Sequence, residues 1–136
     1  MPARRVLFVC RGNTCRSPLA AGLAAQRHGQ ALAAASAGIA AEPGAQAAHD
    51  ALAAGAEEGL DLTAHAARSL DEVDLAAFDR IVALDPAVGE ALRARPGLRE
   101  GALAVWDVPD PWGKGLPAYR STIARLRELV DGLAHD

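Results

Sequence analysis

The chain has 136 residues, with 14 basic and 17 acidic residues and a net charge of −3, so we expect one domain over 1–136. Its 51% hydrophobic and 23% charged residues exclude a disordered or fibrous chain. The charge balance argues against nucleic-acid binding, and no apolar run approaches the ~18 residues of a membrane span. Two cysteines suit a reducing compartment. We therefore expect a cytoplasmic protein that binds neither nucleic acid nor membrane.

The first predicted element is a strand that leads directly to a cysteine. Val6–Val9 is an uninterrupted apolar run, typical of a strand buried on both faces of a parallel sheet. Ser17 is a favourable N-cap and Pro18 suits the first helical position, so a helix is predicted from there to His28. The residues between Cys10 and Ser17 must turn the chain from strand to helix.

The rest of the chain repeats this alternation. We predict a weak strand over 31–36, strands over 80–84 and 103–106, and helices over 44–59, 71–78, 86–94 and from 117 onward. Alternating strands and helices predict an α/β fold, with a parallel sheet flanked by helices on both faces. Ligands of such sheets bind beyond the C-terminal ends of strands, at a topological switch point. Cys10 follows one of these strand ends.

The loop after the first strand has the composition of an anion site. Gly12 and Asn13 tolerate left-handed backbone angles, so a tight loop can point its amides inward. Such a loop before a helix N-terminus binds anions. Arg16 adds a planar, two-pronged donor that suits a phosphate.

Cys10 lies at the base of this predicted anion site. Helix N-termini and nearby cations favour the thiolate form of a cysteine, and Ser17 is placed to donate a further hydrogen bond to it. A thiolate beneath a bound phosphate is a nucleophile for phosphorus. A cysteine that ends a strand is most often a core residue, but the spacing C-x5-R between a strand and a helix start favours the catalytic interpretation here.

The segment "VCRGNTCRSP" at 9–18 resembles the signature of the low-molecular-weight protein tyrosine phosphatases. Blocks that resemble later parts of that family follow in order: "SAG" at 36–38, "LTAHAARSL" at 62–70, "FDRIVALD" at 78–85 and "DPWG" at 110–113. The resemblance implies a three-layer sandwich with a four-stranded parallel sheet, and no metal or cofactor. It implies hydrolysis of a phosphorylated protein, with inorganic phosphate as product, through a cysteinyl-phosphate intermediate. Cys10 would be the nucleophile and Arg16 the clamp on the phosphate.

This mechanism also needs a general acid. Asp107 and Asp110 both follow the last predicted strand, and Asp110 precedes a proline that favours an extended backbone. The residues alone do not separate the two. The resemblance favours Asp110, which matches the Asp of the family's D-P-aromatic motif.

The resemblance also implies roles for residues around the nucleophile. Asn13, Ser17, Ser36 and His65 would form the hydrogen-bonded support of the loop. Cys15 matches a cysteine that can form a disulfide with the nucleophile. The expected substrate-binding residues are Arg11, Gly12, Asn13, Thr14, Cys15, Ser17 and Trp112.

The sequence departs from the tyrosine-specific pattern at several positions. Thr14 stands where isoleucine is common and resembles the protein-arginine-phosphatase branch. Trp112–Gly113 replaces a pair of tyrosines. Arg11 is unusual at the lip of the loop, and Ala21 replaces a frequent glutamate. We therefore expect a phosphotyrosine substrate, with phosphoarginine as the alternative.

Two other functions fit a cysteine after the first strand less well. An arsenate reductase would need further cysteines for a disulfide relay, and only Cys10 and Cys15 are present. A phosphocarrier subunit would hold a phosphoryl group without hydrolysing it. Arg16 and Asp110 argue against the carrier, because a carrier should not have a base that activates water.

Overall fold

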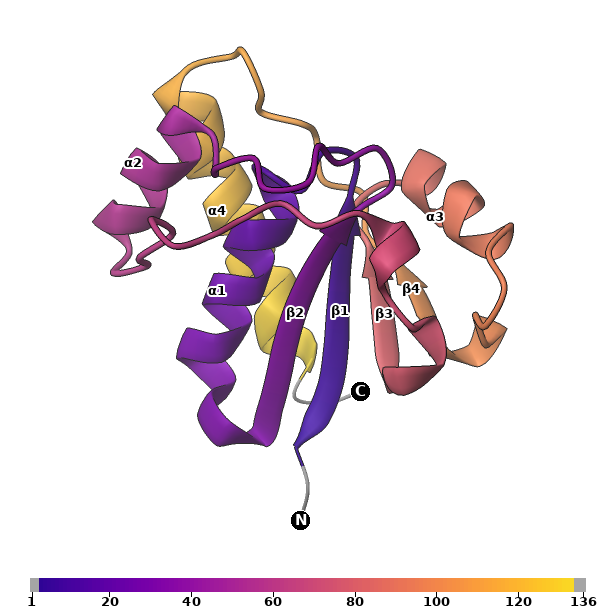
Figure 1. The fold of residues 1–136 in the computed structure, drawn as a ribbon. Coiled ribbons are helices and arrows are strands. Elements are labelled where there is room, and N and C mark those ends of the chain that lie inside the picture. Colours follow the sequence, from indigo (N-terminus) through magenta and orange to yellow (C-terminus); the bar gives the residue numbers. More distant parts are fainter. Residues whose placement is uncertain (1–2, 134–136) are drawn as a thin grey trace.

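The fold is built on one parallel sheet, seen in a computed structural model that describes residues 3–133 (Figure 1). Its strands are β1 (Arg4–Cys10), β2 (Leu32–Gly38), β3 (Arg80–Ala83) and β4 (Leu103–Val105), in the order β2-β1-β3-β4. Because β2 and β3 pair with opposite sides of β1, the topological switch point lies beside the C-terminal end of β1. Cys10 is the last residue of that strand.

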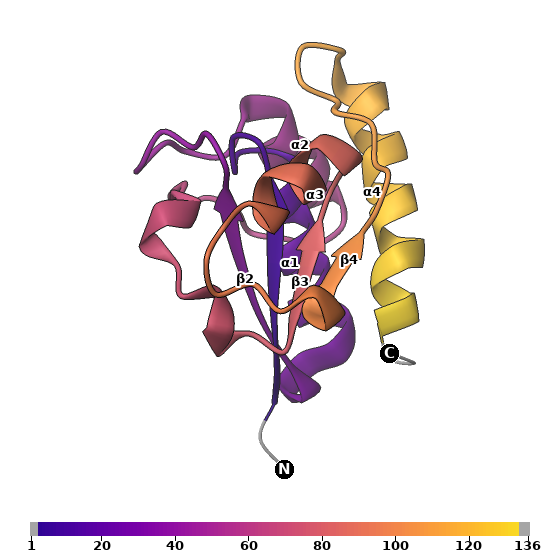
Figure 2. The ribbon, with the colours of Figure 1, turned by 90° about the vertical axis from the view of Figure 1, so that its right-hand side faces the viewer.

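Helices cover both faces of the sheet, which gives three layers (Figures 1 and 2). One face carries α1 (Arg16–His28), α2 (His49–Glu57) and α4 (Leu116–Gly132), and the other carries α3 (Pro86–Arg93). Successive residues of β1 alternate between the two cores, with Val6 and Phe8 on the α1 and α4 side and Leu7 and Val9 on the α3 side. The predicted α/β sandwich is therefore confirmed.

Two predicted helices differ from the structure. The helix predicted over 44–59 begins only at His49, because backbone groups just before it bond elsewhere: Gly44 N to Ala67 O and Ala48 N to Thr14 O. The helix predicted over 71–78 is two short 3₁₀ turns, Leu70–Glu72 and Leu75–Ala77.

Side-chain caps explain why residues 70–77 form two short turns instead of one helix. Ser69 accepts a hydrogen bond from Asp71 N, and Asp74 accepts one from Ala76 N. Such short side chains compete with the helical pattern for backbone donors.

Within residues 3–133, no helix combines the length and the apolarity that crossing a membrane would require.

Candidate active site

The loop of residues 11–15, here called the cysteine loop, joins β1 to α1 and turns at Asn13. Asn13 has a φ of 57°, the one positive value at a non-glycine position within residues 3–133. Asparagine tolerates this conformation better than most residues. The predicted helix start needs a correction: Cys15 is the N-cap of α1, and Ser17 lies inside the first turn. The Ser17 side chain is thus free to face the cysteine instead of capping the helix.

Hydrogen bonds at every polar group of Asn13 hold the turn in place. Its Nδ2 donates to Ser17 Oγ (2.7 Å), and its Oδ1 accepts from Arg68 N (2.9 Å). His65 Nε2 lies 2.7 Å from the Asn13 carbonyl oxygen. Asn13 is fully buried, so these bonds replace the water that its amide loses. The structure thus brings Asn13, Ser17 and His65 together.

Ser36 does not join this group. It lies in β2, paired with Phe8 of β1, and within residues 3–133 no hydrogen bond links its side chain to Asn13 or His65. The Asn13 amide is already bonded to Ser17 and Arg68 at its two ends. The expected support role of Ser36 is therefore not seen in the structure.

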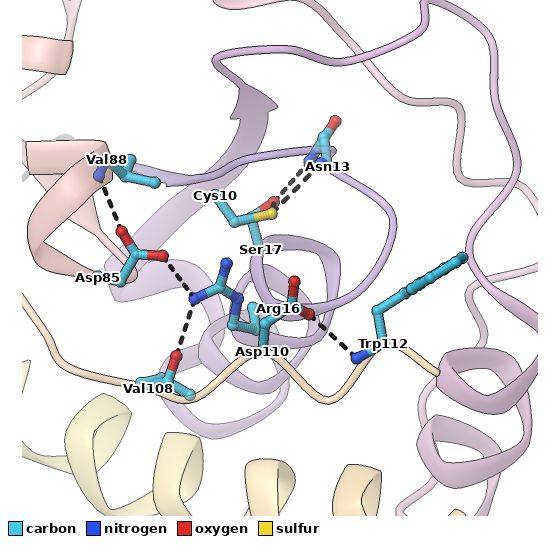
Figure 3. Close-up of polar contacts among 9 residues, drawn as sticks. All are labelled: Cys10, Asn13, Arg16, Ser17, Asp85, Val88, Val108, Asp110 and Trp112. Carbon is cyan, nitrogen blue, oxygen red and sulfur yellow. Dashed lines mark hydrogen bonds and ion pairs between the residues drawn. The ribbon is translucent and has the colours of Figure 1, made fainter. Parts of the chain in front are cut away.

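Cys10 lies at the base of the cysteine loop, with 3% of its surface exposed. Its Sγ is 2.9 Å from Ser17 Oγ, and Asn13 N donates to it at 3.3 Å (Figure 3). A thiolate can accept hydrogen bonds from a hydroxyl and from a backbone amide. Asn13 therefore has two contacts at the site: its side chain positions Ser17, and its backbone amide contacts the Cys10 sulfur.

Arg16 is buried behind the cysteine loop and is held by two partners. Its Nη1 donates to Asp85 Oδ2 (2.9 Å) and to the carbonyl oxygen of Val108 (2.8 Å), which Figure 3 shows on one edge of the guanidinium. Asp85 is also the N-cap of α3, where it accepts from Val88 N (2.8 Å). Arg16 is therefore positioned both by Asp85, which lies between β3 and α3, and by Val108, which follows β4.

The sequence interpretation missed Asp85. Partial burial raises the pKa of this carboxyl, but the hydrogen bond from Val88 N and the Arg16 guanidinium outweigh burial, so the pKa lies below its ordinary value. The signal was present in the sequence, because Asp85 follows a buried strand and precedes Pro86, the pattern of an N-cap before a first-turn proline. Its contact with Arg16, 69 positions away, has no local signature.

A cavity of about 300 Å³ opens above Cys10. Its lining residues are Cys10, Arg11, Gly12, Thr14, Cys15, Arg16, Ala40, Asp110 and Trp112. All of these except Ala40 were predicted as site residues. This space, here called the Cys10 cavity, is large enough for a phosphorylated side chain.

Asp110 reaches the Cys10 cavity from the loop of residues 106–115, here called the β4–α4 loop. Its Oδ1 accepts from Trp112 N (3.1 Å), and the Trp112 ring, 68% exposed, extends away from it (Figure 3). Asp107 does not line the cavity. The geometry therefore favours Asp110 over Asp107 as the carboxyl beside a bound group.

Cys15 faces α4, where Tyr119 is its partner. Its Sγ lies 3.1 Å from Tyr119 Oη. Burial raises the pKa of the Cys15 thiol, although the Tyr119 hydrogen bond opposes that shift. Burial, together with the contact to Cys15, also raises the pKa of Tyr119. Cys15 therefore packs against α4 as a thiol whose pKa lies above its ordinary value, and the sequence did not single out Tyr119.

Comparison with known proteins places this architecture among phosphatases. The family model described as low molecular weight phosphotyrosine protein phosphatase matches residues 5–136. The low molecular weight protein-tyrosine-phosphatase Wzb of Escherichia coli (strain K12) is 33% identical over 133 residues, covering 93% of this chain and 87% of the relative. The protein-arginine-phosphatase of Bacillus subtilis (strain 168) is 32% identical over 141 residues, covering 95% and 93%.

A solved structure agrees over nearly the whole chain. The low molecular weight protein tyrosine phosphatase from T. tengcongensis superposes with a TM-score of 0.90 at 34% sequence identity, covering 98% of this chain and 99% of that one. The chain therefore belongs to the low molecular weight phosphotyrosine protein phosphatase family, which consists of phosphoric monoester hydrolases.

Proposed function

We propose that this protein dephosphorylates protein side chains through a cysteinyl-phosphate intermediate. The observation that carries the proposal is one cavity whose lining includes Cys10, the buried Arg16 and Asp110. These are a nucleophile, an anion clamp and an acid, the three groups that the reaction needs. The two free thiols of Cys10 and Cys15 support a cytoplasmic location, where thiols stay reduced.

The first step transfers the phosphoryl group to sulfur. The Cys10 thiolate attacks phosphorus, the bond between phosphorus and the leaving oxygen breaks, and Asp110 gives its proton to that oxygen. Arg16 and the amides of the cysteine loop stabilise the charge on the other phosphoryl oxygens.

The second step releases the product. Water attacks the phosphorus of the cysteinyl phosphate while Asp110, now a carboxylate, takes a proton from that water. The sulfur–phosphorus bond breaks, inorganic phosphate leaves and the Cys10 thiolate returns. No other group needs to enter the reaction for its atoms and charges to balance.

Phosphotyrosine is the proposed substrate, and the aromatic wall of the cavity supports it. Trp112 offers an exposed ring beside Asp110, where a phosphotyrosine ring can pack by an offset or edge-to-face contact. Phosphoarginine is the second candidate, because Thr14 lines the same cavity and its hydroxyl can accept a hydrogen bond from a guanidinium.

A substitution at Thr14 tests the choice of substrate. The experiment measures kcat/KM on phosphotyrosine and phosphoarginine peptides of one sequence, for the wild type and for Thr14→Ile. Replacing the hydroxyl by an apolar group should shift the ratio toward phosphotyrosine. A ratio that does not change would show that Thr14 has no part in selectivity.

A second experiment tests the intermediate. Cys10→Ser should abolish turnover, because a serine hydroxyl is a far weaker nucleophile at neutral pH than a thiolate. Acid quenching of the wild type during turnover should trap a phosphorylated Cys10 peptide that mass spectrometry detects. Cys15→Ser is the control and should still form the phosphoenzyme. Full activity in Cys10→Ser would contradict the mechanism.

A further inference from the structure

A second cavity lies between the β4–α4 loop and α4, and the proposed mechanism does not use it. This space, here called the flank cavity, has a volume of about 180 Å³. Its lining residues are Val108, Pro109, Asp110, Pro111, Lys114, Ala118, Ser121, Thr122 and Arg125. Figure 2 shows the loop rising from β4 alongside α4 before it enters that helix. Asp110 borders both the flank cavity and the Cys10 cavity.

The buried part of the flank cavity offers mainly apolar contacts. Val108 and Pro111 are buried, and both belong to the β4–α4 loop. Thr122 is buried as well, and its Oγ1 already donates its one hydrogen to Ala118 O (3.0 Å) within α4, so it offers a ligand its methyl group and no further donor. The interior of this cavity therefore suits a hydrocarbon or aromatic group.

The rim of the flank cavity carries two cations, Lys114 and Arg125, against the single carboxylate of Asp110. Lys114 comes from the loop and Arg125 from α4, and both are exposed. Within residues 3–133, no carboxylate pairs with Lys114, and Arg125 has only Glu128, 3.7 Å away on the same helix. An exposed pair of this kind neutralises little. Both charges therefore remain available to an anion from outside the chain.

The size and place of the flank cavity point to part of a larger substrate. Its volume is below the roughly 300–1,000 Å³ of pockets that enclose a whole small ligand, so it fits a single side chain. A phosphorylated residue that reacts in the Cys10 cavity brings its leaving oxygen to Asp110. Because Asp110 borders both cavities, the polypeptide that carries this residue can reach the flank cavity across the β4–α4 loop.

We infer that the flank cavity is a docking subsite for the phosphorylated polypeptide, which inserts an apolar side chain there and places an acidic side chain against Lys114 and Arg125. This inference rests on the proposed function and adds a substrate class to it. The preferred substrates are phosphorylated segments with an apolar and an acidic residue close to the modified residue.

The test compares two phosphotyrosine peptides, one with phenylalanine and glutamate beside the phosphotyrosine and one with alanine at both positions. If the wild type acts on phosphoarginine instead, the same pair is made with that residue. Arg125→Glu should lower kcat/KM about fivefold on the first peptide, mainly through KM, as expected for an exposed charge contact. The alanine peptide and para-nitrophenyl phosphate should be unaffected.

Two further variants separate the apolar interior from the charged rim. Ser121→Trp, at an exposed position of α4, should fill the cavity and remove the preference for the phenylalanine and glutamate peptide. Glu128→Gln is the matched control, because it removes the same ion pair as Arg125→Glu but leaves the cavity lining intact. It should keep the wild-type preference.

The outcomes distinguish this inference from the proposed function. A wild type that hydrolyses neither para-nitrophenyl phosphate nor the peptides contradicts the proposed function itself. A wild type that hydrolyses both peptides equally well, or a preference that survives Arg125→Glu and Ser121→Trp, overturns the docking subsite. A loss shared equally by all three substrates also overturns it, because the variants would then act on the chemistry and not on docking.

Discussion

Cys10 and Cys15 belong to one short segment, but their thiols have different surroundings. Cys10 Sγ lies near two donors, Ser17 Oγ and Asn13 N, at 2.9 and 3.3 Å. Cys15 packs against Tyr119, and burial raises the pKa of its thiol. Nucleophilicity depends on the thiolate fraction of a cysteine. The contacts of Cys10 are consistent with its proposed role as the nucleophile, whereas those of Cys15 pack the loop against α4.

At the scale of the single residue, Asp110 should matter most when the leaving group is poor. Asp110→Ala should lower kcat on phosphotyrosine by about 10²–10⁴, the usual contribution of a general acid. The loss should be much smaller on para-nitrophenyl phosphate, whose leaving oxygen needs less protonation. Steady-state kinetics on both substrates measure the difference.

Asp107→Ala is the matched control for this prediction. Asp107 lies on the same loop but does not line the Cys10 cavity, so both rates should stay close to the wild type. Equal losses on the two substrates in Asp110→Ala would refute the acid role.

At the scale of the element, the end of β2 supports the cysteine loop. Ile39 N donates to Cys10 O, and Ala40 N donates to Arg11 O. Gly38, the last residue of β2, lies so close to the loop that an added Cβ would be 2.7 Å from Arg11 O and 3.0 Å from Asn13 N. Only glycine allows this approach without moving the loop backbone.

Gly38→Ala should therefore displace the cysteine loop. We expect kcat/KM on para-nitrophenyl phosphate to fall at least about tenfold, because small misplacements of catalytic groups are costly. Circular dichroism should still show a folded α/β protein. Gly132→Ala is the control, since an added Cβ there meets no atom within 4 Å and activity should not change. Unchanged activity in Gly38→Ala would mean that the loop adapts to the added methyl group.

The helices, strands and turns also differ in how well local sequence patterns predict them. The strand before Cys10 and the amphipathic last helix were predictable, because each has its own hydrophobic pattern. The two 3₁₀ turns were missed because local side-chain caps at Ser69 and Asp74 divide that segment. The start of α2 was not predictable, since the backbone bond from Ala48 N to the distant Thr14 O decides it. Local propensity yields to such tertiary contacts.

At the scale of the whole molecule, the residues of the cavity come from distant parts of the chain. Signature spacing predicted most of its lining, but the partners that position that lining, Asp85 and Tyr119, are 69 and 104 positions from the residues that they contact. No periodicity or motif spacing in a single sequence encodes such a pairing. The residues that line the cavity were therefore more predictable from the sequence than the residues that position them.

Acid should weaken the whole fold partly through Asp85. Its folded pKa lies below its ordinary value, so its charged contacts stabilise the fold fully above the unfolded pKa of about 3.9 and are lost as the pH falls through the folded pKa. Asp85→Asn keeps a cap for α3 but leaves Arg16 without its counter-charge. It should lower the free energy of unfolding by about 1–3 kcal/mol near neutral pH.

Urea denaturation at about pH 7 and about pH 3 measures this effect. The difference between the wild type and Asp85→Asn should shrink at the lower pH. Asp74→Asn, at an exposed cap, is the control and should change the free energy of unfolding little at either pH. A difference of the same size at both values would show that the Asp85 charge does not contribute.

The two bonds of Arg16 Nη1 hold one part of the Cys10 cavity in place, whereas other lining residues are not held by them. Arg16 Nη1 joins the cap of α3 to the backbone two residues before Asp110, so the proposed phosphate clamp and the proposed proton donor are held by connected contacts. A lysine, with its single ammonium and different shape, could not replace this arginine. Thr14 and Trp112 lie outside these contacts, and the Trp112 ring is largely in solvent. Substitutions at these two walls can therefore change which phosphorylated residue is accepted while the reaction itself stays the same.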